Sequence, residues 1–173
     1  MKYDFQGQAY VFSTSCLDVL SSNRQRTFLA KEIGGQLFAR FTEGVIVIEV
    51  ATVTSGRSRR TRFGFWPDRD TERQDIARLF ENGLHYIGDW HTHPEECPTP
   101  SNTDIRKALE IFNQSQHELK AMLMVIVGRS QFPDGLFVGA VTALNILTCR
   151  LTDGPFQIVA ADACTDDGLQ AKC

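Results

Sequence analysis

Three prolines within seven residues restrict the path of this chain more than any other feature of its sequence. They are Pro94, Pro98 and Pro100. Proline fixes φ and has no backbone N–H, so neither a helix nor a central strand runs through such a segment. Residues 85–93 before it have the pattern of a strand, and a helix is expected to begin after it at Ser101 or Asn102. The sequence therefore predicts a strand and a helix joined by a restricted, irregular loop.

Short apolar runs on both sides of this loop predict helices separated by strands. Further strands are predicted at residues 8–12 (an edge strand), 36–41, 45–54, 61–66, 122–127, 136–141 and 144–150, with hairpin turns at Glu43-Gly44 and Asp134-Gly135. The other helices are predicted over residues 14–30, ended by Gly34-Gly35, and from Asp70 or Thr71 to Asn82-Gly83. The apolar positions of the three helices are Leu17, Leu20, Phe28 and Leu29; Ile76, Leu79 and Phe80; and Ile105, Leu109 and Phe112. This order predicts the α/β (α+β) class, with helices packed on a mixed sheet.

Length and composition fit one domain. A chain of 173 residues with 42% hydrophobic content buries a sizeable core, and its net charge of −3 gives no electrostatic reason to expect a nucleic-acid partner. The apolar runs are too short to span a bilayer, and the first residues lack the apolar stretch of a secretory signal, so we expect no membrane contact and a cytoplasmic location. The five cysteines are scattered without a C-x-x-C pair and suit reduced thiols. We expect a domain over residues 1–152 and a C-terminal extension over 153–173, with one strand at 156–159 or partial disorder.

The chemistry concentrates where the predicted strand meets the proline loop. Residues two apart on a strand share a face, so His91 and His93 present two imidazoles side by side. Imidazole nitrogens suit Zn²⁺, and a catalytic zinc site needs a third protein ligand and one open position. Asp104, in the first turn of the next helix, can supply that carboxylate. A second interpretation treats Ser101 and Asp104 as an S-x-x-D capping box, which competes for the carboxylate because a metal ligand is not free to cap.

Length and spacing exclude most metal enzymes that share an H-x-H fragment. A TIM-barrel amidohydrolase needs ~250 residues, a zinc deaminase needs P-C-x-x-C, and the helix H-E-x-x-H is absent. What remains is H-T-H-P, with seven residues between His93 and Ser101, followed by S-x-x-D from Ser101 to Asp104. This pattern resembles the JAMM signature of the JAB/MPN metallopeptidases. Lys31-Glu32-Ile33-Gly34-Gly35 resembles the family's upstream glutamate element, and the resemblance covers roughly residues 8 to 150.

The resemblance implies a fold and a division of labour in the site. It implies an MPN/JAB-type sheet sandwiched by helices, with Zn²⁺ on His91, His93 and Asp104. Glu32 would be the general base, and Ser101 would donate a hydrogen bond to the oxyanion. Without the resemblance, Glu32 would be interpreted only as an exposed carboxylate at a helix end.

The resemblance also implies a substrate class. Proteins with this site cut peptide or isopeptide bonds after the C-terminal tail of ubiquitin or a ubiquitin-like protein. The chain is most similar to bacterial stand-alone JAB peptidases, and more narrowly to the peptidases of CBASS anti-phage operons that release a conjugated cGAS/DncV-like nucleotidyltransferase. Two alternatives stay open: a peptidase that processes sulfur-carrier or ubiquitin-like precursors, and a non-catalytic MPN interaction module.

Smaller expectations attach to residues around the site. Asp89 is a candidate hydrogen-bond partner for a ligand histidine, and Trp90 is expected to shield the ligand strand. We hypothesise that the Cys97 thiolate can occupy the open zinc position, although a passive loop thiol is the simpler interpretation. The remaining expectations are that His85 and His117 are structural, that Met122 and Met124 belong to the core, and that Arg57, Arg59, Arg60 and Arg62 form a solvated face or a docking surface for an acidic partner.

Overall fold

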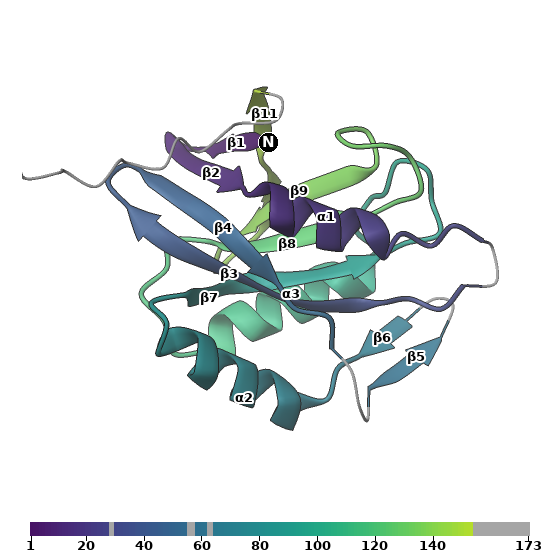
Figure 1. Ribbon diagram of the computed structural model, residues 1–173, viewed down its shortest axis with the longest axis horizontal. Coiled ribbons are helices and arrows are strands. Elements are labelled where there is room, and N and C mark those ends of the chain that lie inside the picture. Colours follow the sequence, from purple (N-terminus) through teal and green to yellow (C-terminus); the bar gives the residue numbers. More distant parts are fainter. Residues whose placement is uncertain (28–29, 55–57, 62–63, 154–173) are drawn as a thin grey trace, which may run out of the picture.

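The computed structural model describes residues 1–153, except for residues 28–29, 55–57 and 62–63 (Figure 1). The described residues form an α+β fold in which helices pack on a mixed sheet. The strands are β1 (Lys2–Phe5), β2 (Gln8–Phe12), β3 (Gly34–Thr42), β4 (Val45–Ala51), β5 (Arg59–Thr61), β6 (Gly64–Trp66), β7 (His85–Thr92), β8 (Met122–Val127), β9 (Leu136–Val141), β10 (Ile146–Thr148) and β11 (Arg150–Asp153). The helices are α1 (Thr14–Ser22), α2 (Arg69–Phe80) and α3 (Asn102–Gln114). None of these helices is long and apolar enough to cross a membrane.

Nine of the described strands form one curved sheet in the order β10-β9-β8-β7-β3-β4-β2-β1-β11. The two outer strands are consecutive in the chain and are separated only by Cys149, whose N–H donates to the carbonyl of Val138 at 2.9 Å. β10 pairs with β9, and β11 pairs with β1. A single run of chain therefore occupies both ends of the sheet, which curves around a shared core.

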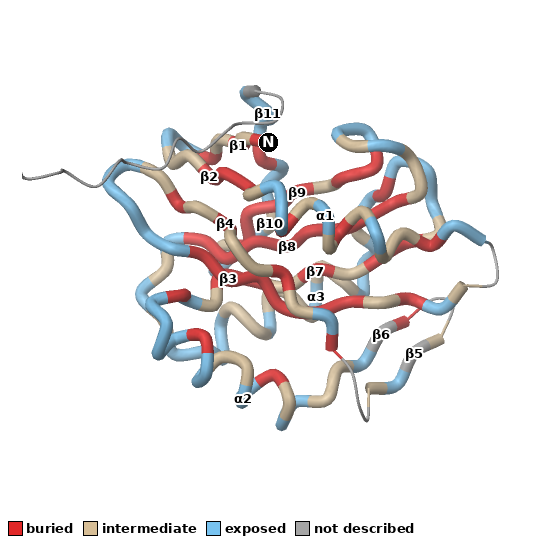
Figure 2. Tube along the Cα trace, viewed as in Figure 1, coloured by how far each residue is buried: buried red, intermediate tan, exposed pale blue. Residues whose placement is uncertain are grey.

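One face of the sheet encloses the main core, and α1 packs into it. Phe12, Leu37, Ile48 and Val125 from four strands are fully buried there with Leu20 of α1. Figure 2 shows that the buried residues concentrate on the central strands, whereas the helices carry more of the exposed ones. Burial of these apolar side chains is the main force that holds the curved sheet together.

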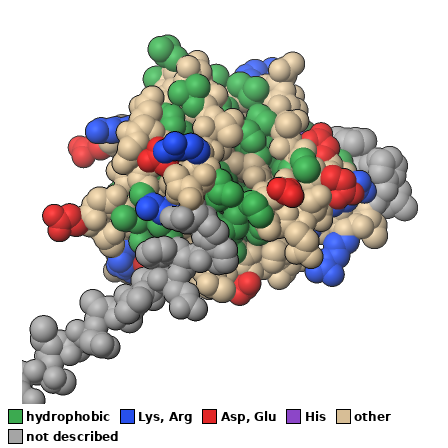
Figure 3. All heavy atoms as spheres, turned by 90° about the horizontal axis from the view of Figure 1, so that it is seen from above, with side chains coloured by type: hydrophobic (Ala, Val, Ile, Leu, Met, Phe, Trp, Pro, Cys, Tyr) green, Lys and Arg blue, Asp and Glu red, His purple; other side chains and the backbone are tan. Residues whose placement is uncertain are grey.

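The helices α2 and α3 cover the opposite face of the sheet. Met124 of β8 lies in a cluster with Leu109 and Phe112 of α3, and Phe38 of β3 lies in a cluster with Leu79 of α2. β7 runs between β3 and β8, so the space above it lies between the two helices. In the view of Figure 3, acidic and basic side chains are scattered among other atoms and do not gather into one patch.

Several expectations from the sequence are confirmed here. β8 and β9 have the predicted bounds, 122–127 and 136–141. α3 begins at Asn102 with Ser101 as its N-cap, and Leu109 and Phe112 face the sheet as expected. Met122 and Met124 are core residues, as expected.

The predicted first helix is too long. α1 ends at Ser22 instead of residue 30, because Asn23 caps it: the Asn23 side-chain amide donates to the carbonyl of Val19 at 2.8 Å. The expected apolar positions Phe28 and Leu29 lie outside the described residues. Leu17 and Leu20 pack on the core as expected.

The glycine pair was wrongly expected to end that helix. Gly34 and Gly35 are the first residues of β3. A Cβ on Gly35 would lie 1.9 Å from the carbonyl oxygen of Thr52, so the glycine permits a close backbone approach instead of a helix end.

Four predicted strands and one predicted helix face also need correction. β2 was expected at an edge of the sheet but lies between β1 and β4. β4 ends at Ala51, and the strand expected at 61–66 is a separate hairpin, β5–β6. The strand expected at 144–150 begins only at Ile146 and divides at Cys149 into β10 and β11. Phe80 is 61% exposed at the end of α2, whereas Leu79 is buried. The strand expected at 156–159 lies outside the described residues.

Candidate metal centre

The strand β7 presents its side chains alternately to two faces. His91 and His93 lie two residues apart and face the same side, and their Nε2 atoms are 3.1 Å apart. Trp90 and Thr92 face the main core and are almost fully buried. The indole N–H of Trp90 donates to the carbonyl of Thr52 at 2.8 Å, which anchors the strand that carries the histidines. This agrees with the expectation that Trp90 supports the ligand strand.

The proline loop returns the chain to the end of β7. The backbone N–H groups of Arg129 and Ser130 donate to the carbonyls of Glu95 and Glu96 at 2.7 and 3.2 Å. A Cβ on Gly128 would meet the loop at 2.6 Å, so a glycine is needed for this close packing. The loop is therefore fixed against the β8–β9 connection, and α3 starts beside the histidines.

Asp104 in the first turn of α3 completes a group of three possible metal ligands. Its Oδ1 lies 3.5 Å from Nε2 of His91, and its Oδ2 lies 3.3 Å from Nε2 of His93. The three ligand atoms lie within 4.8 Å of one another. The structure thus brings together the three residues that the sequence suggested as ligands.

The capping box and the metal group coexist at Asp104. Its Oδ2 accepts hydrogen bonds from the backbone N–H and the hydroxyl of Ser101 at 2.8 and 2.6 Å, and Ser101 caps the Asp104 N–H at 3.2 Å. The two roles were expected to exclude each other. The carboxylate serves both instead, because Oδ2 closes the box and lies beside His93 while Oδ1 faces His91.

The three residues fit one divalent cation. Two atoms bonded to a single zinc ion at ~2.0 to 2.1 Å with near-tetrahedral angles lie about 3.4 Å apart. The two Nε2 atoms are 3.1 Å apart, Oδ1 of Asp104 lies 3.5 Å from His91, and Oδ2 lies 3.3 Å from His93. With one ligand atom taken from each residue, the three atoms lie within 4.8 Å of one another, so they can surround one ion. Two imidazoles and a carboxylate leave one open position in a tetrahedral site, which is typical of a catalytic zinc.

The charge states of His91 and Asp104 suit a cation, whereas the raised pKa of His93 favours a protonated ring that must lose its proton before it binds one. Burial favours the neutral form of His91 and lowers its pKa. Burial acts against the charge of His93 too, but Asp104 and Glu32 raise its pKa. Burial would raise the pKa of Asp104, yet the hydrogen bonds from both histidines hold that pKa well below its usual range. The carboxylate is therefore ionised and needs a positive partner.

Glu32 lies in the same cavity, well after the end of α1 at Ser22, and is not the exposed carboxylate at a helix end that the simpler interpretation expected. The cavity has a volume of ≈ 540 Å³ and is lined by the three candidate ligands together with Glu32 and Ser101. The Glu32 residue is only 6% exposed, and its backbone N–H donates to the carbonyl of Thr61 at 2.8 Å. Burial raises the pKa of Glu32 to about 7, with His93 opposing and Asp104 adding to the shift. A carboxyl group with this pKa can accept and return protons near neutral pH.

Two residues of the cavity were missed in the sequence. Lys107 of α3 lies one turn after Asp104, and its Nζ is 5.0 Å from the ring centroid of Trp66 on β6. Its ammonium group also lowers the pKa of Glu32. The spacing of Lys107 from Asp104 on one helix face could have revealed it, whereas nothing in the sequence places Trp66 in the site.

The expected role of Asp89 is not what the structure shows. Asp89 faces the cavity, but its carboxylate accepts a hydrogen bond from the Tyr86 hydroxyl at 3.0 Å. Burial, followed by repulsion from Glu72, raises the pKa of Asp89 to about 7. Among the described residues, it is the Glu95 carboxylate that lies near the other ring nitrogen of a candidate ligand, at 3.9 Å from Nδ1 of His93.

The other two histidines have structural surroundings, as expected. His85 lies edge-on between the rings of Phe41 and Phe80, at 5.3 and 5.4 Å. The Nδ1 atom of His117 accepts the backbone N–H of Leu119 at 3.2 Å.

The Arg-rich segment is only partly described. Arg57 and Arg62 lie outside the described residues, as does the side chain of Arg60. The guanidinium of Arg59 lies 5.6 Å from the ring centroid of Trp66. The role expected for this segment therefore stays a prediction.

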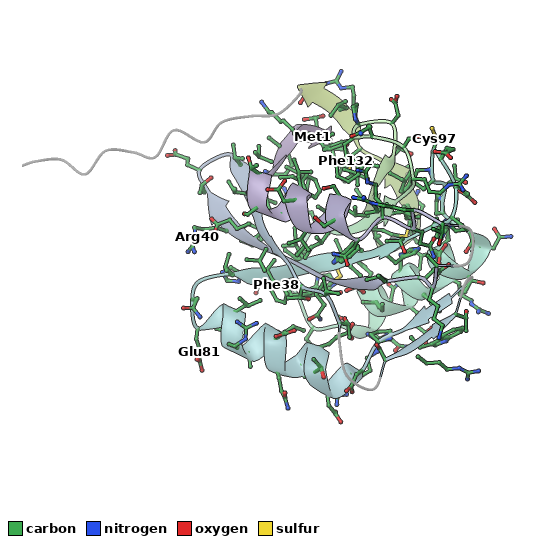
Figure 4. The ribbon with its side chains drawn as sticks, turned by 45° about the vertical axis from the view of Figure 1, so that its right-hand side comes forward. Met1, Phe38, Arg40, Glu81, Cys97 and Phe132 are labelled. Carbon is green, nitrogen blue, oxygen red and sulfur yellow. The ribbon has the colours of Figure 1, made fainter. Side chains whose placement is uncertain are left out.

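Cys97 is exposed in the proline loop, at the edge of the molecule in Figure 4. It is not among the residues that line the cavity. The loop is held by the two backbone hydrogen bonds described above and by an ion pair of 2.8 Å between Glu96 and Arg129. A thiolate at the metal would require this loop to leave its position.

The sequence of residues 14–138 matches the family model for prokaryotic homologs of the JAB domain. The chain belongs to this family. Among its relatives, the CD-NTase/cGAS isopeptidase of Escherichia coli (strain TW11681) is 31% identical over 129 residues, which cover 73% of this chain and 80% of that protein. The CD-NTase/cGAS isopeptidase of Pseudomonas aeruginosa (strain BWHPSA011 / Pa011) is 32% identical over 124 residues, covering 69% and 77% of the two chains.

A third relative carries a broader name. The "Probable metalloprotease y4qB" of Sinorhizobium fredii is 28% identical over 127 residues, covering 69% of this JAB chain and 77% of that protein. The fold also matches the solution structure of a protein from Desulfitobacterium hafniense, with a TM-score of 0.58 and 15% identity, covering 80% of this chain and 88% of the other. This likeness supports the JAB fold alone.

Proposed function

We propose that this JAB chain is a zinc-dependent isopeptidase that releases a conjugated CD-NTase, a cGAS/DncV-like nucleotidyltransferase, from its targets in CBASS anti-phage defence. The cut would fall just after the C-terminal residue of the CD-NTase. The names of the relatives from Escherichia coli and Pseudomonas aeruginosa support this substrate.

One observation carries the proposal. Three candidate ligands, a buried carboxyl group and a hydroxyl group from three separate parts of the chain line a single cavity. They are His91, His93, Asp104, Glu32 and Ser101. A scaffold that only held a partner's tail would have no need for a buried carboxyl group, that of Glu32, in the cavity of the three candidate metal ligands.

Each residue has a defined task in the hydrolysis. Zinc, when held by His91, His93 and Asp104, supplies a Lewis acid that lowers the pKa of bound water to about 7. Glu32 takes a proton from the attacking water as the new C–O bond forms, and returns it to the departing lysine amine as the C–N bond breaks. The Ser101 hydroxyl would donate a hydrogen bond to the substrate oxygen that becomes negatively charged, and for this its single proton turns from Oδ2 of Asp104 to that oxygen.

The shape of the cavity suits an extended tail. It continues from the ligands along β7 to Asp89 and, on the neighbouring strand, Met124. Trp66 on the hairpin side and Ile111 on α3 form its walls. A C-terminal tail lying in this groove would pass its last carbonyl over Glu32.

The proposal includes the extent and location of the domain. We place the catalytic domain at residues 1–152 and the extension at 153–173, and the pairing of Lys2 with Asp153 supports a boundary close to these residues. A cytoplasmic location agrees with the free thiols of Cys16, Cys97 and Cys149.

The substrate is tested with two fusion proteins. In one, a CD-NTase from a CBASS operon is joined through its C-terminus to a reporter protein, and in the other a sulfur-carrier protein takes its place. The zinc-loaded chain should release the reporter from the CD-NTase fusion and leave the other fusion intact. Cleavage of only the sulfur-carrier fusion would move the assignment to precursor processing, and cleavage of neither would favour a non-catalytic module.

A matched pair of variants tests the chemistry. Glu32→Gln keeps the size of the side chain but removes the proton acceptor, so cleavage should fall by at least ~10²-fold. Glu110 is an exposed carboxyl group of α3, and Glu110→Gln should cleave like the wild type. Unchanged cleavage by Glu32→Gln would contradict the proposed mechanism.

A further inference from the structure

Two successive backbone N–H groups at Glu32 donate hydrogen bonds to other elements of the fold. The N–H of Glu32 donates to the carbonyl of Thr61 at the end of β5. The next N–H along the chain, that of Ile33, donates to the side-chain Oγ1 of Thr92 at 3.0 Å. The first bond fixes the amino side of the Glu32 Cα, and the second fixes the peptide on its carboxyl side.

We propose that Thr92 is a positioning residue that holds the general base Glu32 in reach of the reacting water. The inference rests on the proposed function, because it concerns the same site. Thr92 lies between the two candidate ligand histidines. Neither metal binding nor packing of the core requires a hydroxyl group at this position.

The ladder between β3 and β7 explains why a side chain is used here. Gly34 pairs with His91 in that ladder, and one residue further the Thr92 N–H donates to the Ile33 carbonyl at 2.8 Å. In return, the Ile33 N–H donates to the side-chain hydroxyl oxygen of Thr92 instead of to a backbone carbonyl. The hydroxyl oxygen therefore extends the ladder to the residue that follows Glu32.

The position of Thr92 separates this task from metal binding. Side chains alternate along β7, so the Thr92 side chain points away from the face that carries His91 and His93. Thr92 is 0% exposed, so no water replaces a lost hydroxyl without a rearrangement. The Ile33 N–H would then be left without an acceptor, and the segment that carries Glu32 would shift.

A small shift of Glu32 is costly because proton transfer requires close contact with the water. A displacement of ~1 Å of a catalytic group lowers the rate by roughly 10²-fold. We therefore expect loss of the Thr92 hydroxyl to lower kcat, whereas KM and zinc content stay close to those of the wild type.

The chain offers a matched control for this bond. The Thr52 Oγ1 accepts the backbone N–H of Gln36 at 3.1 Å, so it too holds an N–H of β3 through a hydroxyl group. Gln36 lies four residues after Glu32 and does not line the cavity. Thr52→Val should thus lose stability without losing kcat.

The experiment compares zinc-loaded Thr92→Val, Thr92→Ser and Thr52→Val on the CD-NTase–reporter fusion, alone and combined with Glu32→Gln. Thr92→Val should lower kcat at least about tenfold, and Thr92→Ser should restore most of it. In the Glu32→Gln background, Thr92→Val should have no further effect, because Thr92 acts through Glu32. Wild-type kcat in folded Thr92→Val, or a loss that persists in that background, would overturn the inference.

Two further results keep the outcomes distinct. If Thr92→Val does not fold, Thr92→Cys replaces it, since sulfur is a weak acceptor; equal kcat in Thr92→Cys and Thr92→Ser would then overturn the inference. Wild-type kcat in Glu32→Gln itself would instead reject the proposed function.

Discussion

The hydroxyl of Ser101 donates to Oδ2 of Asp104 at 2.6 Å, while Oδ1 of the same carboxylate faces His91. The start of α3 is therefore capped by the residue that we propose as a metal ligand. Oδ2 closes the cap and also lies 3.3 Å from Nε2 of His93, so the helix cap itself holds the carboxylate against both histidines. The carboxylate is held in place before the metal arrives, which lowers the cost of ordering the site.

Ser101→Ala should affect both stability and rate. Loss of the cap should lower the free energy of unfolding by about 1 kcal/mol. Loss of the donor to the substrate oxygen should lower kcat on the order of 10²-fold. Ser13 caps α1 by accepting the N–H of Cys16 at 3.1 Å, and Ser13→Ala supplies the control. Denaturant titration should show that the two variants are destabilised to a similar extent. The value of kcat should fall in Ser101→Ala only. Equal kcat values in Ser101→Ala and Ser13→Ala would contradict the role assigned to the Ser101 hydroxyl.

The sequence predicted this site better than it predicted the elements around it. The spacing of His91, His93, Ser101 and Asp104 restricts the residues to one strand end and one helix start, and the structure places them there. The alternation of side chains along a strand and the capping of a helix depend on residues that are close in the sequence, so both can be predicted from the sequence.

Gly35→Ala should be strongly destabilising. The new Cβ would meet the Thr52 carbonyl at 1.9 Å and the Trp90 Nε1 at 3.1 Å, so β3 or the Trp90 anchor must move. We expect a loss of about 3 kcal/mol in the free energy of unfolding.

Gly7→Ala is the comparison for Gly35→Ala. Gly7 has a φ of +84°, and no atom lies within 4 Å of the position that a Cβ would take, so its substitution costs only backbone strain of about 1 kcal/mol. Urea titration of both variants measures the difference. Equal losses would contradict the close-approach explanation of Gly35.

Cys97→Ser should leave cleavage within about twofold of the wild type. The thiol is exposed and the loop is held by the Glu96–Arg129 ion pair, so a passive thiol is the better interpretation of this structure. Initial rates under reducing conditions measure the effect. A several-fold gain in the serine variant would support the opposite hypothesis, in which the thiolate silences the zinc site.

The metal-free protein should lose stability as the pH rises, because of Glu32. Its pKa is about 7 in the folded chain against an ordinary value of 4.5. Between these values the folded state binds more protons than the unfolded state, so the free energy of unfolding falls as the pH rises through this window. Glu32→Gln removes this dependence and should be more stable than the wild type above pH 7, by about 1 to 3 kcal/mol.

Thermal unfolding in chelator measures this effect at about pH 5 and about pH 8. The stability difference between Glu32→Gln and the wild type should grow between the two conditions. Glu110→Gln, at an exposed position, should show no such change. If the stability difference between Glu32→Gln and the wild type were the same at both pH values, the Glu32 carboxyl group would not have the raised pKa that its burial predicts.

Long-range contacts account for what the sequence did not reveal. Gly35 is explained by Thr52 and Trp90, which are distant in the sequence, and the segment of Glu32 is held by the hairpin and by Thr92 of β7. Trp66 reaches the cavity because the hairpin lies opposite α3, which no local pattern reports. The proposed role of Glu32 therefore rests on family resemblance, to which the structure adds that Glu32 lines one cavity with His93 and Asp104.

The most direct test of the account is the zinc content of the purified chain together with its cleavage of the CD-NTase–reporter fusion. Elemental analysis should find about one zinc ion per wild-type chain and far less in Asp104→Asn, since a catalytic site needs all three protein ligands. Chelation should abolish cleavage by the wild type, and added zinc should restore it. Full cleavage by chain stripped of metal, or wild-type zinc content in Asp104→Asn, would contradict the metal centre proposed here.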